Sequence, residues 1–142
     1  MGNRAVVKGP DGNTGVYLHW NGGLGPVAGI CRAAKELGYR DPVEDPCYSL
    51  ARFTFLAGVL ECEDGLSVGV GDAEFDLDGE PDNGVYTVGK DWKIIKREGV
   101  GKARLRPAGP DAERAKWLAE ELVARVKHLR EFAGRKTEGV AQ

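Results

Sequence analysis

The chain has 142 residues, of which 42% are hydrophobic and 30% charged, as in an ordinary soluble globular protein of one domain. No apolar run approaches the roughly 18 residues of a membrane span, so we expect no membrane association. Three cysteines without a CxxC pair argue against a disulfide framework and favour a reducing compartment. Residues 1–4 lack the hydrophobic region of a signal peptide, so we expect a cytoplasmic protein.

The net charge of −2 is unevenly distributed along the chain. Residues 1–95 contain 8 Lys/Arg and 15 Asp/Glu, a net charge of −7, whereas residues 96–136 contain 12 and 6, a net charge of +6. An acidic body with a basic C-terminal arm can bind polyanions through the arm or pair head to tail with a second copy. The simpler alternative is a solvated helix with its charges on the outer side.

Turn and periodicity signals divide the first half of the chain into a hairpin followed by two helices. Proline, glycine and asparagine in residues 9–13 favour a turn, and the segments on both sides of it have the pattern of short strands, which predicts a hairpin. Helical spacing begins near Pro26, which suits a first helical turn, and ends at Gly38. The predicted elements are strands at 4–8 and 16–20 and helices at 26–37 and 48–60.

The second half of the chain is predicted to contain short strands and one long helix, which ends at Gly134. Residues 1–135 should form a single α+β domain, and residues 136–142 a disordered tail. The expected fold is an antiparallel sheet of five or six strands, with two helices inserted after the first hairpin and a long C-terminal helix. The predicted elements are strands at 66–70, 85–88, 92–96 and 103–106 and a helix from Asp111 to about Phe132.

A strand-to-helix junction at Val16–Pro26 combines polar side chains with three glycines. Backbone N–H groups at a helix start can hold an anion, here beside His19, Trp20 and Asn21. The run Gly23–Ala28 also matches the dinucleotide fingerprint G-x-G-x-x-A. A Rossmann domain is not expected, because a proline-bounded loop follows the helix where a second parallel strand should stand. The junction therefore predicts a phosphate or carboxylate site, with a purely structural turn as the alternative.

Aromatic and polar side chains around this junction suit a nucleotide. Aromatic rings stack on a base, whereas arginine and backbone N–H groups bind phosphate. Two further rings, Tyr86 and Trp92, belong to the same set, although they and Trp20 can equally be core aromatics. The candidate ligand-binding residues are Tyr17, His19, Trp20, Asn21, Gly22, Gly23, Gly25 and Arg52.

The acidic segment 72–82 resembles the first half of a calcium-binding loop, because acids occupy alternate positions. The closing bidentate glutamate of such a loop is missing, since Val85 stands in its place. We therefore expect a solvated loop without a tight calcium site.

Metal and catalytic chemistry have little support elsewhere in the sequence. The three cysteines, Cys31, Cys47 and Cys62, are spaced too widely to form a zinc-ligand pair. The two serines of the chain do not lie in a nucleophile elbow. We expect no metal, no cofactor and no catalytic residue, with His19 as the one candidate acid or base.

Seven short motifs form a distinctive set: Asn3–Ala5, Tyr17–Gly23, Gly38–Arg40, Ala51–Arg52, Leu66–Val70, Asp82–Tyr86 and Trp92–Ile94. The set resembles a family of small uncharacterised proteins encoded in bacteriophages and prophages, over roughly residues 3–98. Pro26 and the long basic C-terminal helix depart from the family pattern. The resemblance implies no residue roles. It implies a small accessory protein in the cytoplasm of an infected bacterium, of a kind that often inhibits host defence.

Three classes of function follow from these observations. The leading one is a protein that binds a phosphorylated small molecule or nucleotide at the junction without turnover, and so sequesters a host defence signal. The second is a protein that blocks a host defence effector through its acidic surface or its C-terminal helix. The third is a small hydrolase that uses His19, which would need a second catalytic group.

The C-terminal helix carries more apolar surface than one sheet can cover, which favours a homodimer. Antiparallel pairing through this helix would place Glu120 and Glu121 near Arg125 and Lys127 of a second copy. The alternative is that the whole apolar face packs inside one chain. The apolar residues concerned are Trp117, Leu118, Leu122, Val123, Val126, Leu129 and Phe132.

Overall fold

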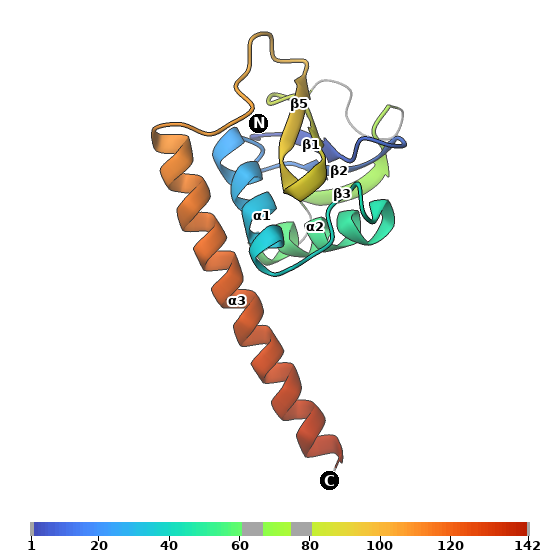
Figure 1. Cartoon of the computed structure of the whole chain (residues 1–142), viewed down its shortest axis with the longest axis vertical. Coiled ribbons are helices and arrows are strands. Elements are labelled where there is room, and N and C mark those ends of the chain that lie inside the picture. Colours follow the sequence, from blue (N-terminus) through green and yellow to red (C-terminus); the bar gives the residue numbers. More distant parts are fainter. Residues whose placement is uncertain (1, 61–66, 75–80, 142) are drawn as a thin grey trace.

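The computed structural model describes residues 2–60, 67–74 and 81–141, with residues 135–141 described by their backbone alone. Cys62 and six residues of the acidic segment 72–82 lie outside this part of the chain, so the calcium prediction remains a prediction. The described residues form a five-stranded sheet, three α-helices and one 3-10 turn (Figure 1). The elements are β1 (Ala5–Lys8), β2 (Thr14–Leu18), α1 (Leu24–Glu36), α2 (Pro46–Leu60), β3 (Val68–Asp72), β4 (Val85–Val88), η1 (Lys90–Trp92), β5 (Ile94–Glu98) and α3 (Pro110–Ala141).

The predicted α+β class is confirmed, with two helices after the β1–β2 hairpin and a long C-terminal helix. The strand order is β3-β2-β1-β4-β5, and three of the four strand pairs are antiparallel. The pairing of β1 with β4 differs from the prediction, because these two strands are parallel, with Val6 opposite Val85. The sheet is therefore mixed. After β3 the chain crosses to the other side of β1, and this crossover leaves no local signal in the sequence.

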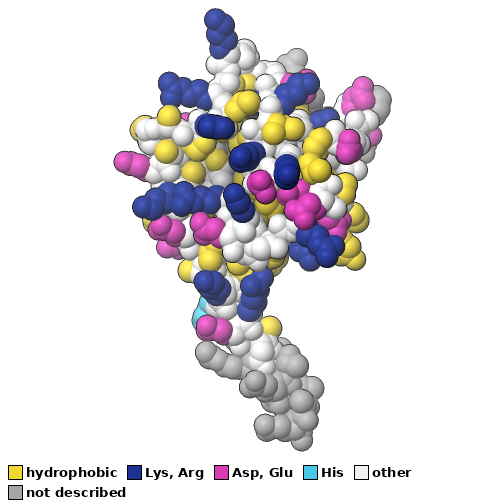
Figure 2. Space-filling model, viewed as in Figure 1, with side chains coloured by type: hydrophobic (Ala, Val, Ile, Leu, Met, Phe, Trp, Pro, Cys, Tyr) yellow, Lys and Arg dark blue, Asp and Glu magenta, His cyan; other side chains and the backbone are white. Residues whose placement is uncertain are grey.

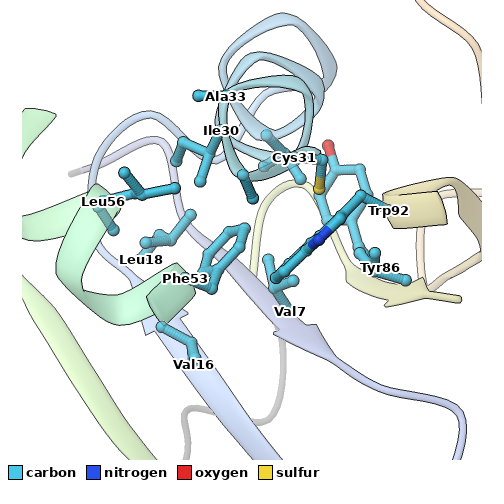
Figure 3. Packing of buried hydrophobic residues seen from close by; sticks show 14 of the residues in the cluster. Val7, Val16, Leu18, Ile30, Cys31, Ala33, Phe53, Leu56, Tyr86 and Trp92 are labelled. Atoms are coloured by element: carbon cyan, nitrogen blue, oxygen red, sulfur yellow. The ribbon is translucent and has the colours of Figure 1, made fainter. Parts of the chain in front are cut away.

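Helices α1 and α2 cover one face of the sheet, and the hydrophobic core lies between them and the strands (Figure 3). The β strands alternate in the expected way, so Val7, Val16 and Leu18 point to this face. Ile30 of α1 and Phe53 of α2 pack against these residues and are almost fully buried. Each such side chain contributes roughly 1.5–3 kcal/mol through its burial.

Helix α3 packs against α1 through small residues. A Cβ at Gly29 would lie 3.0 Å from the Leu118 Cβ and 3.1 Å from the Ala115 carbonyl oxygen, so a larger residue here would have to push the two helices slightly apart. Leu122 of α3 is fully buried in the same core. The C-terminal half of α3 extends beyond the sheet and the other helices (Figure 1).

The optional sixth strand is absent from the described residues, and the predicted end of the last helix is wrong. Residues 103–106 do not form a strand, and α3 continues past Gly134, which keeps a helical backbone. Glycine in a helix costs only about 1 kcal/mol relative to alanine, so it is a weak stop signal without a left-handed backbone. The helix backbone also runs through residues 136–141, the range for which the sequence predicts a disordered tail.

The turn between β4 and β5 also differs from the predicted hairpin. Strand β5 begins at Ile94 rather than at residue 92, because Trp92 belongs to the short 3-10 turn η1. Asp91 and Trp92 both have positive φ angles, of 57° and 59°. The Trp92 indole N–H donates to the carbonyl oxygen of Tyr39 over 2.9 Å, and the side chain is only 5% exposed. Burial of this ring offsets the strained backbone.

Candidate functional site

Backbone hydrogen bonds hold the junction after β2 in place. The His19 N–H donates to the Ser67 carbonyl oxygen over 2.8 Å, and the His19 carbonyl oxygen accepts from the N–H of Asn3 over 2.9 Å. The Gly22 N–H donates to the Asn3 carbonyl oxygen over 2.8 Å. One of the amides that the sequence assigned to an anion is therefore already used inside the protein.

The predicted aromatic residues at the junction do come together. The Tyr17 hydroxyl and the His19 Nδ1 lie 3.0 Å apart, and the rings of His19 and Trp20 meet edge to face at 5.1 Å. Tyr17 alternates with Val16 and Leu18, so Tyr17 and the His19 ring beside it lie on the sheet face opposite the helices. Trp20 is 46% exposed, so it is not a core aromatic.

Close packing explains two of the three junction glycines, Gly22 and Gly25, but not Gly23, where a Cβ would make ordinary contacts. A Cβ at Gly22 would collide with the Asn3 carbonyl oxygen. A Cβ at Gly25 would lie 3.3 Å from the Asp111 Oδ1, because the start of α3 packs against the start of α1. A carboxylate therefore already stands at the positive end of α1, where it opposes a second anion. Gly23 is the residue before the first turn of α1, without a side-chain cap.

Arg52 does not join this group. It lies on α2, which packs on the other face of the sheet, and its guanidinium stacks on two tyrosine rings. The guanidinium carbon is 5.4 Å from the ring centre of Tyr39 and 5.2 Å from that of Tyr48. The candidate residues thus divide between two places, with Asn21 and the glycines at the junction and Arg52 apart from them.

Arg52 lines a cleft with a volume of about 590 Å³, which we call the Arg52 cleft. Its walls come from the end of α1, the loop that follows, α2, and the second half of α3. This volume is within the usual range of small-molecule sites. The lining residues are Leu37, Gly38, Tyr39, Arg40, Asp45, Tyr48, Arg52 and Arg130.

A buried carboxylate positions the loop wall of the cleft. Asp41 is 2% exposed, and its carboxylate accepts backbone N–H bonds from Val43 and Glu44, each over 2.9 Å, and from Asp91 over 2.8 Å. Burial by itself raises the pKa of Asp41, but these hydrogen bonds outweigh it and hold the pKa below its ordinary value. The charged carboxylate therefore ties the loop to the β4–β5 turn.

A second carboxylate positions the start of α2. The Tyr48 N–H donates to the Asp45 Oδ1 over 3.1 Å, so Asp45 caps the helix. Tyr48 and Arg52 then lie one helical turn apart on the same face, which brings the ring and the guanidinium together.

The cleft has an excess of positive charge. Asp45 lies 3.8 Å from Arg40, as a partly exposed ion pair. Arg52 and Arg130 have no carboxylate partner within the described part of the chain. Three arginines therefore face one carboxylate, and the planar edge of the Arg52 guanidinium remains available for a phosphate or a second carboxylate.

The sequence identified Arg52 but missed its partners. Tyr39 and Arg40 come from the loop after α1 and Arg130 from α3, and only the fold brings these two segments to Arg52. The spacing of Tyr48 and Arg52, four residues apart on a predicted helix, was the one local signal that was available.

The described residues contain no cluster suited to a metal ion, and one of their two cysteines is buried. Among them, no group of three or more His, Cys, Asp or Glu side chains could hold a metal ion. Burial raises the pKa of the Cys31 thiol to about 12, so Cys31 is an unreactive core residue. Tyr86 and Trp92 are buried as core aromatics, and the Tyr86 hydroxyl donates to the Gly22 carbonyl oxygen over 2.9 Å.

Comparisons with protein-family models, with curated proteins and with solved structures found no match. None of the helices in the described ranges combines the length and the apolar content that crossing a membrane requires.

Proposed function

We propose that this protein binds a phosphorylated small molecule or a nucleotide in the Arg52 cleft, without turnover. The observation that carries the proposal is the guanidinium of Arg52, stacked on Tyr39 and Tyr48 and without a carboxylate partner among the described residues. Aromatic stacking fixes the guanidinium in one orientation and leaves its N–H groups directed at a ligand.

The charges and rings of the cleft fit the two parts of a nucleotide. Arg40, Arg52 and Arg130 supply guanidinium donors for a phosphate, and hydrogen bonds to charged groups contribute about 1.5–3 kcal/mol each. The side chain of Tyr48 is 60% exposed, so one face of its ring is available to a base. The loop that carries Tyr39 is already ordered by Asp41, which reduces the entropy lost on binding.

The cleft supports binding better than catalysis. Its lining contains no His, Cys, Ser or Lys, and its one carboxylate, Asp45, caps α2 and pairs with Arg40. No nucleophile and base stand together there. A hydrolase that uses His19 has less support, because the described partners of that ring are the Tyr17 hydroxyl and the Trp20 ring, and neither is a carboxylate or a nucleophile of the usual hydrolase type. Binding without turnover fits the sequestration of a host defence signal by a phage-type accessory protein.

The test is a thermal-shift screen with inorganic phosphate and with mono-, di- and cyclic nucleotides, followed by calorimetric titration. We expect Arg52→Gln to weaken binding of the best ligand by about tenfold to a hundredfold, because one charged donor group is lost. Arg104→Gln is the matched control, since Arg104 is exposed and lies outside the cleft lining. Equal affinities of the two variants would contradict the proposal.

Recovery of the bound ligand distinguishes binding from turnover. After incubation and denaturation, mass spectrometry should return the nucleotide intact. Altered nucleotide would support an enzyme instead. A screen without any thermal shift would favour the alternative that the protein acts by blocking a host protein.

A further inference from the structure

Strand β5 forms one edge of the sheet and is the starting point of a second inference. It pairs with β4 on one side, and no described strand pairs with it on the other. An edge strand presents a row of N–H and C=O groups that can pair with another extended chain.

A groove runs beside this edge, and we call it the β5 groove. Its volume is about 740 Å³, and it lies between α1, η1 with β5, residues 105–107 and the first turns of α3. Figure 2 shows hydrophobic side chains on this face of the molecule with Lys and Arg side chains around them. The lining residues are Ala28, Cys31, Arg32, Lys35, Asp91, Trp92, Lys93, Ile94, Ile95, Leu105, Arg106, Pro107, Ala112 and Ala115.

The apolar part of the groove is partly open to solvent. Cys31, Trp92 and Ala115 are buried, whereas Ile95 is 51% and Leu105 37% exposed. Large apolar side chains that flank an open groove are typical of contact sites for another molecule.

The rim of the groove is basic. Four cations, Arg32, Lys35, Lys93 and Arg106, surround it, against the single carboxylate of Asp91. Arg32 pairs with Glu36 over 3.2 Å on the outer side of α1. The other three have no carboxylate partner within the described ranges. An occupant with negative charge is therefore favoured.

We propose that the β5 groove binds an extended acidic segment of a partner protein, which adds to the sheet as a strand next to β5. Backbone hydrogen bonds to the free edge of β5 supply affinity, and alternate side chains of the segment reach the groove. Apolar side chains contact Ile95 and Leu105, and carboxylates meet Lys93 and Arg106.

The groove is a poorer match for a nucleic acid. Single-stranded nucleic acids need exposed aromatic rings on which bases stack. The one aromatic residue in the lining is Trp92, which is 5% exposed, so it cannot offer the face of its ring. The β5 groove shares no lining residue with the Arg52 cleft, so experiments can refute either proposal without affecting the other.

The probe is a fluorescein-labelled peptide of about ten residues, long enough to span β5, in which Val and Glu take turns at every second position and Thr fills the positions between them, so that both Val and Glu face the groove; we call it the Glu–Val peptide. Fluorescence anisotropy measures its affinity, with a Lys–Val peptide and an oligothymidine of similar length as competitors. Two further peptides carry N-methyl groups on every second backbone nitrogen: one on the odd-numbered residues and the other on the even-numbered residues. Strand addition predicts that only one of these two registers loses binding, because one side of a paired strand faces away from the sheet.

Charge reversal tests the rim. Lys93→Glu combined with Arg106→Glu should weaken binding of the Glu–Val peptide at least tenfold, whereas Lys127→Glu on the outer side of α3 should change it less than twofold. Circular dichroism confirms that each variant is folded. Absence of binding at millimolar peptide, equal effects of both N-methylated registers, or stronger binding of the oligothymidine would each overturn the proposal.

Discussion

Asp41 shows how one side chain orders a functional wall. Its carboxylate accepts three backbone N–H groups from two separate segments of the chain. The sequence marked this region only as a proline-bounded loop, because a run of acids and prolines does not reveal which acid turns inward. Which carboxylate of such a loop is buried can be recognised only from the folded structure, which shows the backbone N–H groups that donate to it.

We predict that Asp41→Ala lowers the free energy of unfolding by about 2–3 kcal/mol, because three backbone N–H groups lose a buried charged acceptor. Asp41→Asn should lower the free energy of unfolding by less than Asp41→Ala does, and it should also change how stability depends on pH. The folded pKa of Asp41 is lowered, so its carboxylate stabilises the fold above the unfolded pKa of about 3.9, and this contribution disappears as the pH falls through the folded value. Urea unfolding should therefore show a steeper loss of stability below pH 4 for the unmodified protein than for Asp41→Asn. Parallel curves would contradict this role.

Cysteine reactivity provides a second prediction at this scale. With a pKa of about 12, the Cys31 thiol stays protonated at pH 8 and is shielded from solvent. Cys47 is exposed. Iodoacetamide should label Cys47 but not Cys31 in the native protein, as peptide mass spectrometry can measure. Rapid labelling of Cys31 without unfolding would show that the core is more open than described.

At the scale of elements, local sequence patterns predicted the helices and the first hairpin, but they did not predict the contacts between segments that are distant in the sequence. The hairpin, both inserted helices and the start of α3 follow from turn residues and periodicity. The parallel contact of β1 with β4 depends on a crossover, and the turn at Trp92 depends on a distant acceptor, the Tyr39 carbonyl oxygen. Long-range partners decide both features, so no window of sequence could reveal them.

Two helical glycines provide a matched pair of variants. Gly29→Ala should destabilise the protein by about 1–3 kcal/mol, because its Cβ would press on Leu118 and Ala115 where α1 meets α3. Gly58→Ala on α2 should stabilise it by about 0.5–1 kcal/mol, because nothing lies within 4 Å of the added Cβ. Chemical denaturation of both variants measures the difference. The same sign for both changes would refute the close contact of the two helices.

At the scale of the whole molecule, the apolar surface of α3 is divided. Leu118, Leu122 and Val126 pack inside the chain. Trp117, on the other hand, is 54% exposed, and Phe132 is 59% exposed. Helix α3 thus keeps exposed apolar side chains along its length, and these motivate our proposal of a homodimer.

We expect light scattering to give about twice the chain mass of 15.3 kDa at micromolar concentration. Leu129→Glu with Phe132→Glu should reduce it to one chain mass while circular dichroism stays unchanged, because both side chains are exposed within one chain. Leu122 is unsuitable for this test, since it belongs to the core. A monomeric unmodified protein would contradict the proposal.

The candidate site was only partly accessible from the sequence. Tyr17 and His19 are two residues apart at one strand end, so alternation was enough to group them, whereas alternation would place Trp20 on the other face, and its contact with His19 arises after β2 has ended at Leu18. Arg52 was assigned to the same ligand, but the sheet separates it from that group, and its actual neighbours come from other segments. The anion site predicted at the junction glycines also has less support, because the Gly22 N–H already donates to Asn3 and the Asp111 carboxylate lies beside Gly25.

The most direct test of the central proposal locates the ligand in solution. In a ¹H–¹⁵N NMR titration with adenosine monophosphate, or with the nucleotide that gives the largest thermal shift, chemical-shift changes should concentrate on Tyr39, Tyr48 and Arg130 and on the Nε–H of Arg52. The Arg52→Gln variant should lose these changes at the same ligand concentration. Shift changes confined to Gly22–Gly25 and His19, with the residues of the Arg52 cleft unaffected, would contradict the account.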